Sequence, residues 1–325
     1  MSLFQERSRL DIERQLDANM SPGATRTTRG RLEFEHPDPH RSAFDRDRDR
    51  VLHAKAFRRL KHKTQVFINP EGDHYVTRLT HTLQVTQIGR SIARYLGLNE
   101  PLAEAICLAH DVGHSPFGHT GEEALSDYVE GEWLHSEQGV RVFSVLEPLN
   151  LTWEVLDGVR AHSWKIAKGP ATPEGMVCRF ADRIAYLTHD VEDAVRAEVI
   201  TVADLPARAK RAFGVLGSEW IHTLVQAVVS ESAGSEAISM DPETLEVMNE
   251  LREFMFERVY LRPESLPQRN QAMQVVHDLV DHVSRTPELI PETYQHSDAT
   301  QMRQVLDYVS GMTDRYALRL HDELT

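Results

Sequence analysis

Apolar residues recur at steps of three and four along most of this 325-residue chain, which is the spacing of amphipathic helices. One predicted helix starts at Thr80, a residue type that favours N-caps, and is stopped by Gly97. Its apolar stripe consists of Val85, Ile88, Ile92 and Leu96. Pro101 stands at a favoured first-turn position of the next helix, which reaches His110 and Asp111. The pattern indicates a predominantly helical protein.

Further helices are predicted from the same periodicity. They are expected at 45–63, 120–130, 136–147, 152–163, 177–197, 205–230, 241–260 and 299–322. The stretch NPEGD between QVFI and HYVT predicts a small β-hairpin near residues 65–77. Residues 1–42 are polar and rich in helix breakers, so we expect a short helix followed by extended coil. AKGPATPEG, at 167–175, predicts a loop.

These elements predict an all-α fold with a small β-hairpin and a C-terminal helical extension. We expect an N-terminal extended and partly helical segment at 1–42, a catalytic core at 43–200 and a helical region at 201–325 that packs on the core. The chain contains neither a tandem repeat nor a stretch typical of a flexible linker. It is therefore interpreted as a single structural unit.

Composition narrows the class of protein. Charged residues make up 26% of the chain and hydrophobic residues 41%, as in ordinary globular proteins. No apolar run approaches the roughly 18 residues of a membrane span, and the charged N-terminus has no apolar signal core. Only Cys107 and Cys178 occur, both within apolar helical patterns, so no disulfide framework is expected. We expect a cytoplasmic protein without a membrane partner.

Charge is unevenly distributed along the chain. The net charge of −14 argues against broad, non-specific binding to nucleic acid. A nucleic-acid partner is possible, but the sequence does not indicate one. Residues 41–63 nevertheless hold nine Lys or Arg residues and three Asp, a local excess of six positive charges. This basic island has two interpretations of equal weight. It could bind one anionic ligand, or it could be a solvated helix with ion pairs, because RDRDR alternates in sign.

One segment concentrates groups that carry chemistry. HDVGHSPFGHTGEEAL, at 110–125, combines imidazoles and carboxylates with helix breakers. The ionisable groups are His110, Asp111, His114, His119 and Glu122, and the breakers are Gly113, Pro116 and Gly118. A packed core does not need this composition and a solvated loop does not favour it. It is typical of a metal-assisted active site.

A metal site is also indicated by residues on three separate predicted helices. His81 begins one helix, His110 and Asp111 end the next, and Asp182 lies on a third. Two imidazoles and two carboxylates suit a divalent ion such as Mn²⁺, Fe²⁺, Mg²⁺ or Zn²⁺. Without nearby cysteine pairs, a structural zinc site is not expected. The alternatives without a metal are that His81 caps a helix and that Asp182 is an acidic residue on the surface.

The helix around Asp182 has two distinct faces. At 100° per residue, one arc of about 60° is apolar and forms the expected core face. It consists of Phe180, Ile184, Leu187 and Val191. An adjoining arc of about 100° holds Asp182, Arg183, Tyr186 and Asp190. This arc is either a pocket wall or the ordinary polar border of an amphipathic helix.

The order H…HD…D resembles the metal signature of the HD phosphohydrolase superfamily. Seven longer sequence stretches resemble one family within that superfamily, the deoxyguanosine triphosphate triphosphohydrolase-like family. They are RDRDRVLHAKAFRRLKHKTQVF, RLTHTLQV, AHDVGHSPFGHTGEEAL, LHSEQGVR, ADRIAYLTHDVEDA, FMFERVY and DYVSGMTDRYAL. They follow in order from about Thr25 to Leu320, nearly the whole chain. The resemblance implies an HD-domain helical fold.

The resemblance also implies roles for individual positions. It implies metal ligands at His81, His110, Asp111 and Asp182. It implies catalytic positions at His119, Glu122, His135 and His114. Phosphate contacts are implied at Arg78, Arg183 and Arg258, and contacts to the deoxyribose at Gln65, Tyr186 and Asp190. Many relatives carry ADD where this chain has ADR, so the basic residue at position 183 could alter the phosphate contacts.

The implied activity is metal-dependent hydrolysis of a deoxynucleoside triphosphate, dGTP or a broader set, to deoxynucleoside and inorganic triphosphate. One divalent ion per active site is implied, Mn²⁺ or Mg²⁺ first, with Fe²⁺, Zn²⁺ and Ni²⁺ as alternatives. A homo-oligomer, tetramer or hexamer, and an activating dNTP are implied as partners. The alternatives are another HD-type nucleotide phosphohydrolase and a nucleotide-sensing regulator with weak catalysis.

Overall fold

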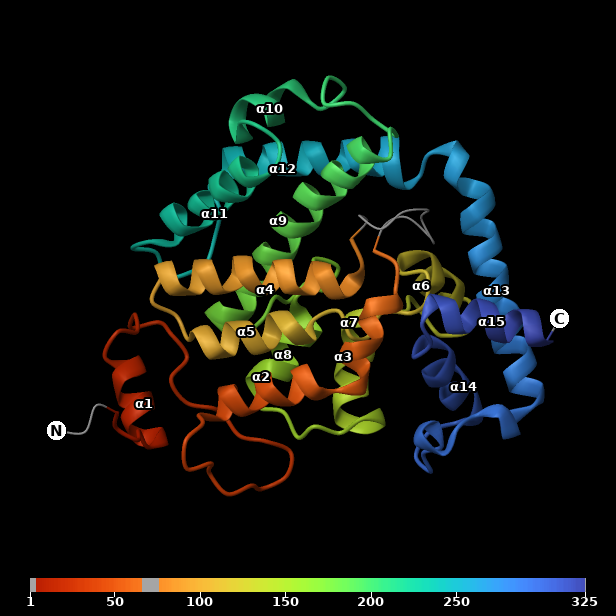
Figure 1. The fold of residues 1–325 in the computed structure, drawn as a ribbon, viewed down its shortest axis with the longest axis horizontal. Coiled ribbons are helices and arrows are strands. Elements are labelled where there is room, and N and C mark those ends of the chain that lie inside the picture. Colours follow the sequence, from red (N-terminus) through yellow and green to blue (C-terminus); the bar gives the residue numbers. More distant parts are fainter. Residues whose placement is uncertain (1–3, 66–75, 325) are drawn as a thin grey trace.

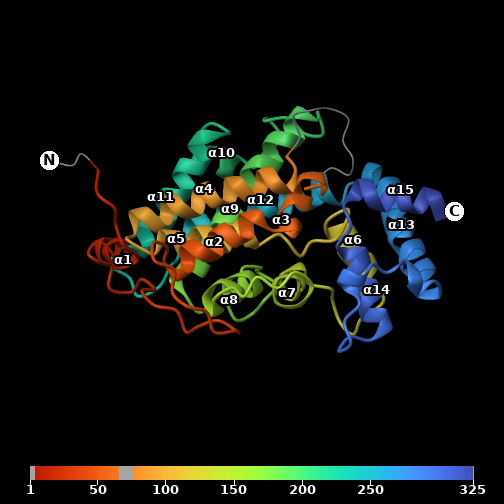
Figure 2. The same cartoon turned by 60° about the horizontal axis from the view of Figure 1, so that its bottom comes forward.

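The computed structural model describes residues 4–65 and 76–324, and these ranges contain fifteen α-helices and no β-strand. The predicted all-α fold is confirmed. Most of the predicted hairpin, residues 66–75, lies outside the described residues. At the two ends of that segment, Thr64 and Thr77 form an isolated antiparallel bridge. Helix α1 (Arg9–Asp17) and the C-terminal helices lie at opposite ends of the molecule (Figures 1 and 2).

The helix predicted over 45–63 is divided. It consists of α2 (Ala43–His53), α3 (Lys55–Arg59) and a short 3₁₀ helix, Leu60–His62. Ala54, between α2 and α3, has extended backbone angles. The Glu147 carboxylate accepts hydrogen bonds from the backbone N–H groups of Lys55 and Ala56, at 2.7 and 2.9 Å. A distant side chain therefore caps α3 and supports the break, which local periodicity does not reveal.

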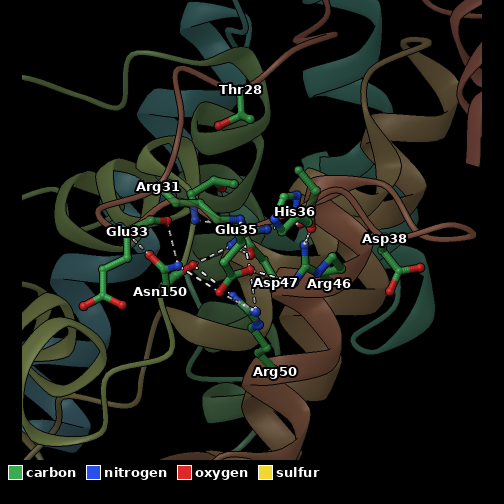
Figure 3. Close-up of polar contacts among 12 residues, drawn as sticks. Thr28, Arg31, Glu33, Glu35, His36, Asp38, Arg46, Asp47, Arg50 and Asn150 are labelled. Carbon is green, nitrogen blue, oxygen red and sulfur yellow. Dashed lines mark hydrogen bonds and ion pairs between the residues drawn. The ribbon is translucent and has the colours of Figure 1, made fainter.

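The basic residues of α2 form ion pairs. Arg46 and Arg50 both pair with Glu35 of the N-terminal segment, at 2.6 and 2.7 Å, and Arg31 pairs with Asp47 (Figure 3). Arg41 and Arg48 likewise pair with nearby aspartates. Of the two interpretations of the basic island, ion pairing therefore holds for α2. These contacts fasten the extended N-terminal coil to the helical core.

Helices α4 (Arg78–Tyr95), α5 (Glu100–Ala109) and α9 (Pro173–Arg196) form the centre of the main core. Helix α4 packs against both α5 and α9 (Figure 1). The N-cap of α4 is Thr77 and not Thr80, because the Thr77 hydroxyl accepts from the Thr80 amide. Gly97 has φ +63° and follows the end of α4, as predicted. Helix α9 starts four residues before the prediction, with Pro173 in its first turn.

Three shorter helices complete the side of the core that carries the histidines. They are α6 (His119–Ser126), α7 (His135–Arg141), which continues as a π-helical turn over Val142–Leu146, and α8 (Trp153–Ala161). They correspond to the predictions at 120–130, 136–147 and 152–163. His119 and His135 each occupy the first residue of a helix. Both side chains therefore start from backbone that is fixed by helix packing.

The C-terminal half departs most from the prediction. The helix expected at 205–230 is two helices, α10 (Ala207–Phe213) and α11 (Ser218–Ser232), separated by Gly214 and Gly217, both with positive φ. Helix α12 (Pro242–Met255) continues as a π-helical turn, Phe256–Tyr260. The helix expected at 299–322 is also two helices, α14 (Gln301–Ser310) and α15 (Asp314–Leu324).

Helix α13 (Leu266–Arg285) was not predicted. Its apolar stripe was nevertheless present in the sequence and is buried in the structure: Ala272, Val275, Val276, Leu279, Val280 and Val283. This stripe forms a second hydrophobic cluster with residues of α6, α14 and α15. Among the described helices, no single one is long and apolar enough to cross a membrane, although the bent pair α10 and α11 together meets that length and composition.

The C-terminal helices hold the loop that precedes α6. Asp314, at the start of α15, accepts hydrogen bonds from the backbone N–H groups of Thr64 and Phe117, both at 2.9 Å. The buried Lys63 ammonium donates to the carbonyl groups of His114 and Ser310. The chain is therefore held at His114 by Lys63 and at Phe117 by Asp314, which lies 197 positions later in the sequence. Ser310 and Asp314 both belong to the stretch DYVSGMTDRYAL, residues 307–318.

Candidate metal centre and active site

Four side chains from α4, α9 and the turn after α5 converge at the centre of the fold. The nearest atoms of His81 and Asp182 are 3.1 Å apart, His81 Nε2 to Asp182 Oδ1. His110 Nε2 lies 3.7 Å from the same Asp182 oxygen and 3.4 Å from Asp111 Oδ1. His81 Nε2 lies 3.9 Å from Asp111 Oδ2. The four positions that the sequence analysis assigned to a metal are therefore neighbours.

The chemistry of this cluster fits a divalent cation. His110 Nδ1 lies 2.7 Å from the Cys107 carbonyl oxygen, so Nδ1 carries the proton and Nε2 presents a lone pair. His110 Nε2 is buried and has no hydrogen-bond partner. Burial opposes ionisation of Asp111, but His110, His114 and Arg78 outweigh it and hold the pKa of that carboxyl well below its usual range. An unshared lone pair beside ionised carboxylates suits a borderline or hard metal ion.

Arg78 lies directly beside this cluster. Its Nη1 donates to Asp111 Oδ2 at 3.0 Å, and both side chains are almost completely buried. A Cβ atom at Gly118 would lie 2.7 Å from Arg78 Nη2, so the turn before α6 packs closely on the guanidinium. The phosphate role implied for Arg78 thus falls on a side chain that also positions an expected metal ligand.

The breakers of the 110–125 segment serve two different purposes. Phe117 and Gly118 have φ of +61° and +58°, and this left-handed turn directs the chain into α6 at His119. Gly113 instead permits a close approach of two backbones. A Cβ atom there would lie 2.0 Å from the His135 carbonyl oxygen and 2.3 Å from the Gly139 amide nitrogen. The glycines therefore bring α6 and α7 onto the metal cluster.

Replacing Gly113 with alanine is expected to destabilise the protein, because its Cβ would overlap the backbone of α7. Overpacking of a rigid backbone contact should lower the free energy of unfolding by about 3 kcal/mol. Urea denaturation of the variant measures the effect. Gly23→Ala is the matched control, because a Cβ at that position meets nothing within 4 Å. Equal stability of the two variants would contradict the close approach.

Glu122 joins three histidines beside the metal cluster. One of its oxygens contacts His114 Nδ1, and the other lies 3.1 Å from His119 Nδ1 and 3.3 Å from His135 Nδ1. The His114 and His135 rings are stacked with centroids 3.7 Å apart. Burial opposes ionisation of Glu122, but these three histidines hold its pKa well below the usual range. The four residues assigned to catalysis thus form one connected group.

The histidines of this group differ in exposure. The His119 side chain is 70% exposed, whereas His114 and His135 are buried. Burial, with smaller contributions from Arg78 and His135, lowers the pKa of His114 to about 4, and burial also lowers the pKa of His135. His114 acts as a fixed bridge between the two carboxylates, since its Nε2 lies 3.0 Å from Asp111 Oδ1 and its Nδ1 contacts Glu122. Only His119 faces solvent, where a water molecule can approach.

His162, at the end of α8, is a further member that the sequence analysis missed. Its Nε2 lies 3.2 Å from His135 Nε2, and its Nδ1 lies 2.7 Å from the Val159 carbonyl oxygen. Burial and His110 lower the pKa of His162 to about 4. The ligand atoms of Asp111, His135 and His162 lie within 4.8 Å of one another, and these residues form one of three groups among the described residues that could hold a metal ion. The AHS sequence context of His162 carried no usable signal.

Comparison with known proteins gives a consistent assignment. Residues 78–187 match the HD domain and residues 238–323 match the phosphohydrolase-associated domain. A deoxyguanosinetriphosphate triphosphohydrolase-like protein from Caldanaerobacter subterraneus is 46% identical, covering 94% of this chain and 92% of the relative. A protein of the same name from Clostridium perfringens is 43% identical, covering 88% of each. The chain belongs to this deoxyguanosinetriphosphate triphosphohydrolase-like family.

Membership gives the protein a broad activity. It is a hydrolase of the HD phosphohydrolase type, and HD domains are metal-dependent. The metal-competent group His81, His110 and Asp182 lies inside the matched HD segment. A solved phosphohydrolase from Bacteroides thetaiotaomicron has a TM-score of 0.52 over 83% of this chain and 67% of that chain, at 17% identity. That likeness shows the shared fold.

Two of the residues that the resemblance assigns to the sugar lie on one face of α9. Tyr186 is half-buried and lies two residues after the core residue Ile184. Asp190 is buried and lies four residues, about one helical turn, after Tyr186. The Tyr260 hydroxyl, from the π-helical turn after α12, donates to Asp190 Oδ2 at 2.7 Å. Gln65 lies at the edge of the described chain, and its buried Oε1 has no hydrogen-bond partner. Tyr260 was not predicted, because nothing in FMFERVY distinguishes it as a partner of Asp190.

Burial raises the pKa of Asp190 to about 8. Its carboxyl keeps a proton in the folded protein up to about pH 8 but loses it near pH 4 when the chain is unfolded. Folding therefore becomes less favourable as pH rises through this window. Asp190→Asn removes the ionisable group, so its stability relative to wild type should improve by up to about 4 kcal/mol between pH 5 and pH 8.

Urea denaturation at several pH values measures the Asp190 effect. Asp298→Asn, at an exposed position, is the matched control and should show no such trend. A constant stability difference for Asp190→Asn across this range would mean that Asp190 is ionised in the folded protein.

Two arginines assigned to phosphates occupy different environments. Arg183 is buried on α9, next to Asp182, with its guanidinium 4.4 Å from the Trp164 ring. Arg258 is exposed, lies 6.0 Å from the Phe254 ring, and acts electrostatically on Asp204. In the described residues no contact joins Arg258 to the histidine cluster. The structure therefore brings Arg183, but not Arg258, next to the expected metal ligands.

Proposed function

We propose that this protein hydrolyses deoxynucleoside triphosphates to deoxynucleoside and inorganic triphosphate. The observation that carries the proposal is the Glu122 group of histidines, which adjoins the four-residue metal cluster. The names of the family members, deoxyguanosinetriphosphate triphosphohydrolase-like, supply the substrate class. We assign the metal site to His81, His110, Asp111 and Asp182, with Mn²⁺ or Mg²⁺ as the ion.

A triphosphate repels an anionic nucleophile, so positive charge must be supplied around it. A divalent ion held by the four ligands supplies Lewis acidity and offsets part of the phosphate charge. Arg78 pairs with Asp111 and Arg183 follows Asp182 in the chain, which supports assigning both arginines to phosphate oxygens through charge-assisted hydrogen bonds. These cations orient the α-phosphorus toward the histidines.

His119 and Glu122 are assigned to the attacking water. Glu122 accepts from His119 Nδ1–H, which leaves Nε2 of the exposed ring with a lone pair that can take a proton from water. The water oxygen then bonds to the α-phosphorus, and the bond from phosphorus to the 5′-oxygen breaks. His135 is assigned to protonate that oxygen, so that the deoxynucleoside leaves as an alcohol.

Tyr186, Asp190 and Gln65 are assigned to the deoxyribose. A protonated Asp190 can donate a hydrogen bond to a sugar hydroxyl, and Tyr260 fixes its orientation. Close packing of these side chains at the 2′ position would exclude ribose. The proposal therefore includes preference for deoxynucleotides.

Product analysis tests the proposed reaction. The purified protein with Mn²⁺ or Mg²⁺ is incubated with each dNTP, alone and in pairs, and with GTP as a ribonucleotide comparison. Turnover of dGTP in ¹⁸O-labelled water is expected to give deoxyguanosine and triphosphate, with the label in triphosphate. Pyrophosphate with dGMP, or orthophosphate with dGDP, would refute the assigned bond. Equal kcat/KM for GTP and dGTP would refute the sugar assignment.

A further inference from the structure

Arg179 extends the functional face of α9 by one turn toward its N-terminus. At about 100° per residue, it falls within the arc already formed by Asp182, Arg183 and Tyr186. Its side chain is buried, with 7% exposed. Neither the metal cluster nor the Glu122 group uses it. A buried cation on this face therefore needs another explanation.

Trp164 holds two guanidinium groups. The Cζ atoms of Arg179 and Arg183 lie 4.5 and 4.4 Å from the centre of its ring. The indole N–H donates to the Arg179 carbonyl oxygen at 3.1 Å, and Arg179 Nη2 donates to the Ile166 carbonyl oxygen at 3.2 Å. Cation–π contacts on both arginines restrict their orientation before any ligand binds.

Among residues 4–65 and 76–324, no carboxylate pairs with either of the two arginines. Each is more than nine-tenths buried, and the Nε atom of each is buried without a hydrogen-bond partner. Burial and Arg183 together lower the pKa of Arg179, and no carboxylate in the described part of the chain opposes this effect. Arg78, by contrast, is buried against Asp111. Two like charges buried together without an anion are costly, which points to an anionic ligand that binds between or beside them.

The position of the pair along α9 indicates which part of a substrate it meets. Asp190, assigned to the sugar, lies eight residues beyond Asp182, or about 12 Å along the axis. Arg179 lies three residues before Asp182, or about 4.5 Å in the opposite direction. The loop that contains Trp164 contacts the segment between α6 and α7, because Lys165 forms an ion pair with Glu132 there. Arg179 therefore lies on the side of Asp182 away from the sugar, and Arg183 lies beside Asp182.

We propose that Arg179 and Arg183, held against Trp164, form the subsite for the terminal phosphate of a triphosphate. This inference rests on the proposed function, since it takes the sugar and metal positions from it. A guanidinium group can bind two phosphate oxygens at once. Stacking on the Trp164 ring holds each guanidinium in one orientation before phosphate binds. The subsite favours a triphosphate over shorter phosphates, because only the longer chain spans from the metal site to Arg179.

Inorganic triphosphate and orthophosphate are the probes for this subsite. Calorimetric titration of the full-length, Mn²⁺-loaded protein compares wild type with Arg179→Gln. The dissociation constant for triphosphate is expected to rise roughly tenfold to hundredfold, as for loss of a charge-assisted contact, while that for orthophosphate stays within about twofold. Arg160→Gln is the matched control, because Arg160 pairs with Asp157 on nearby α8 and should leave both constants unchanged.

Intrinsic fluorescence gives a test that needs no arginine variant. The chain has four tryptophans, and the part of the signal lost in Trp164→Phe belongs to Trp164. Triphosphate, but not orthophosphate, is expected to change that part in the wild-type protein. Unchanged triphosphate affinity in a folded Arg179→Gln protein, or an unresponsive Trp164, would overturn the subsite.

The two proposals fail in different ways. If dNTPs yield triphosphate but Arg179→Gln binds it normally, the subsite is wrong and the proposed function stands. If no dNTP is hydrolysed but triphosphate binding depends on Arg179, the subsite stands and the proposed function fails. Arg179→Lys, which keeps the charge but loses the fork, should restore only part of the affinity.

Discussion

Asp182→Asn is expected to abolish stoichiometric Mn²⁺ binding and dNTP hydrolysis while the helical circular dichroism signal persists. The substitution keeps the size of the side chain but removes the negative charge, 3.1 Å from His81 and 3.7 Å from His110. Changing a residue that merely supports a metal ligand costs about 10- to 100-fold in affinity, so loss of a direct ligand should cost roughly 100-fold or more.

The matched control for this prediction is Asp193→Asn on the same helix. Asp193 is buried but is used elsewhere, since it accepts from the Val76 amide and pairs with Arg196. Its variant should bind one Mn²⁺ per chain, as is expected of the wild type. Retention of stoichiometric Mn²⁺ binding by Asp182→Asn, measured by equilibrium dialysis, would refute the ligand assignment.

His135→Gln should lower kcat by about 10²- to 10⁴-fold while leaving dNTP affinity nearly unchanged. The 5′-oxygen is a poor leaving group unless it is protonated, and burial lowers the pKa of His135, which makes its protonated form a stronger acid. Attack at the β- or γ-phosphorus would expel a phosphate oxygen, which hardly needs an acid. The size of the effect therefore reports which bond breaks.

Single-turnover kinetics with dGTP separates chemistry from binding for His135→Gln. His222→Gln, on the exposed side of α11, is the control for loss of an imidazole and should retain wild-type rates. A fall in kcat of less than tenfold would exclude His135 as the general acid. A large rise in KM with unchanged kcat would instead assign His135 to substrate binding.

Helix periodicity predicted the central core because burial there is set by local pattern. The stripe of Val85, Ile88 and Ile92 is buried as expected, and Gly97 ends its helix. Periodicity failed where distant groups intervene. Glu147 caps α3 and so supports the break at Ala54, which the sequence of 45–63 does not show. Helix α13 was missed although its apolar stripe was visible in the sequence.

The candidate site shows the same division. The residue types around His110 and Asp182 predicted a metal-assisted site, because few other functions need imidazoles and carboxylates in that arrangement. His162 and Tyr260 could not be predicted, since each becomes a site residue only through a contact, with His135 and Asp190 respectively. Arg258, for which the resemblance implies a phosphate contact, is exposed in the described chain, so its role stays a prediction.

The sequence by itself determined the helical class and the family and indicated four candidate metal ligands, since these depend on residue types and their spacing. Only the tertiary structure decided which charges are partnered. It paired the basic residues of α2 with Glu35 and with aspartates, and it left Arg179 and Arg183 buried on Trp164 with no acid from the described residues beside them. The physical reason is that charge pairing and burial depend on distances between segments far apart in the chain, which local spacing does not encode.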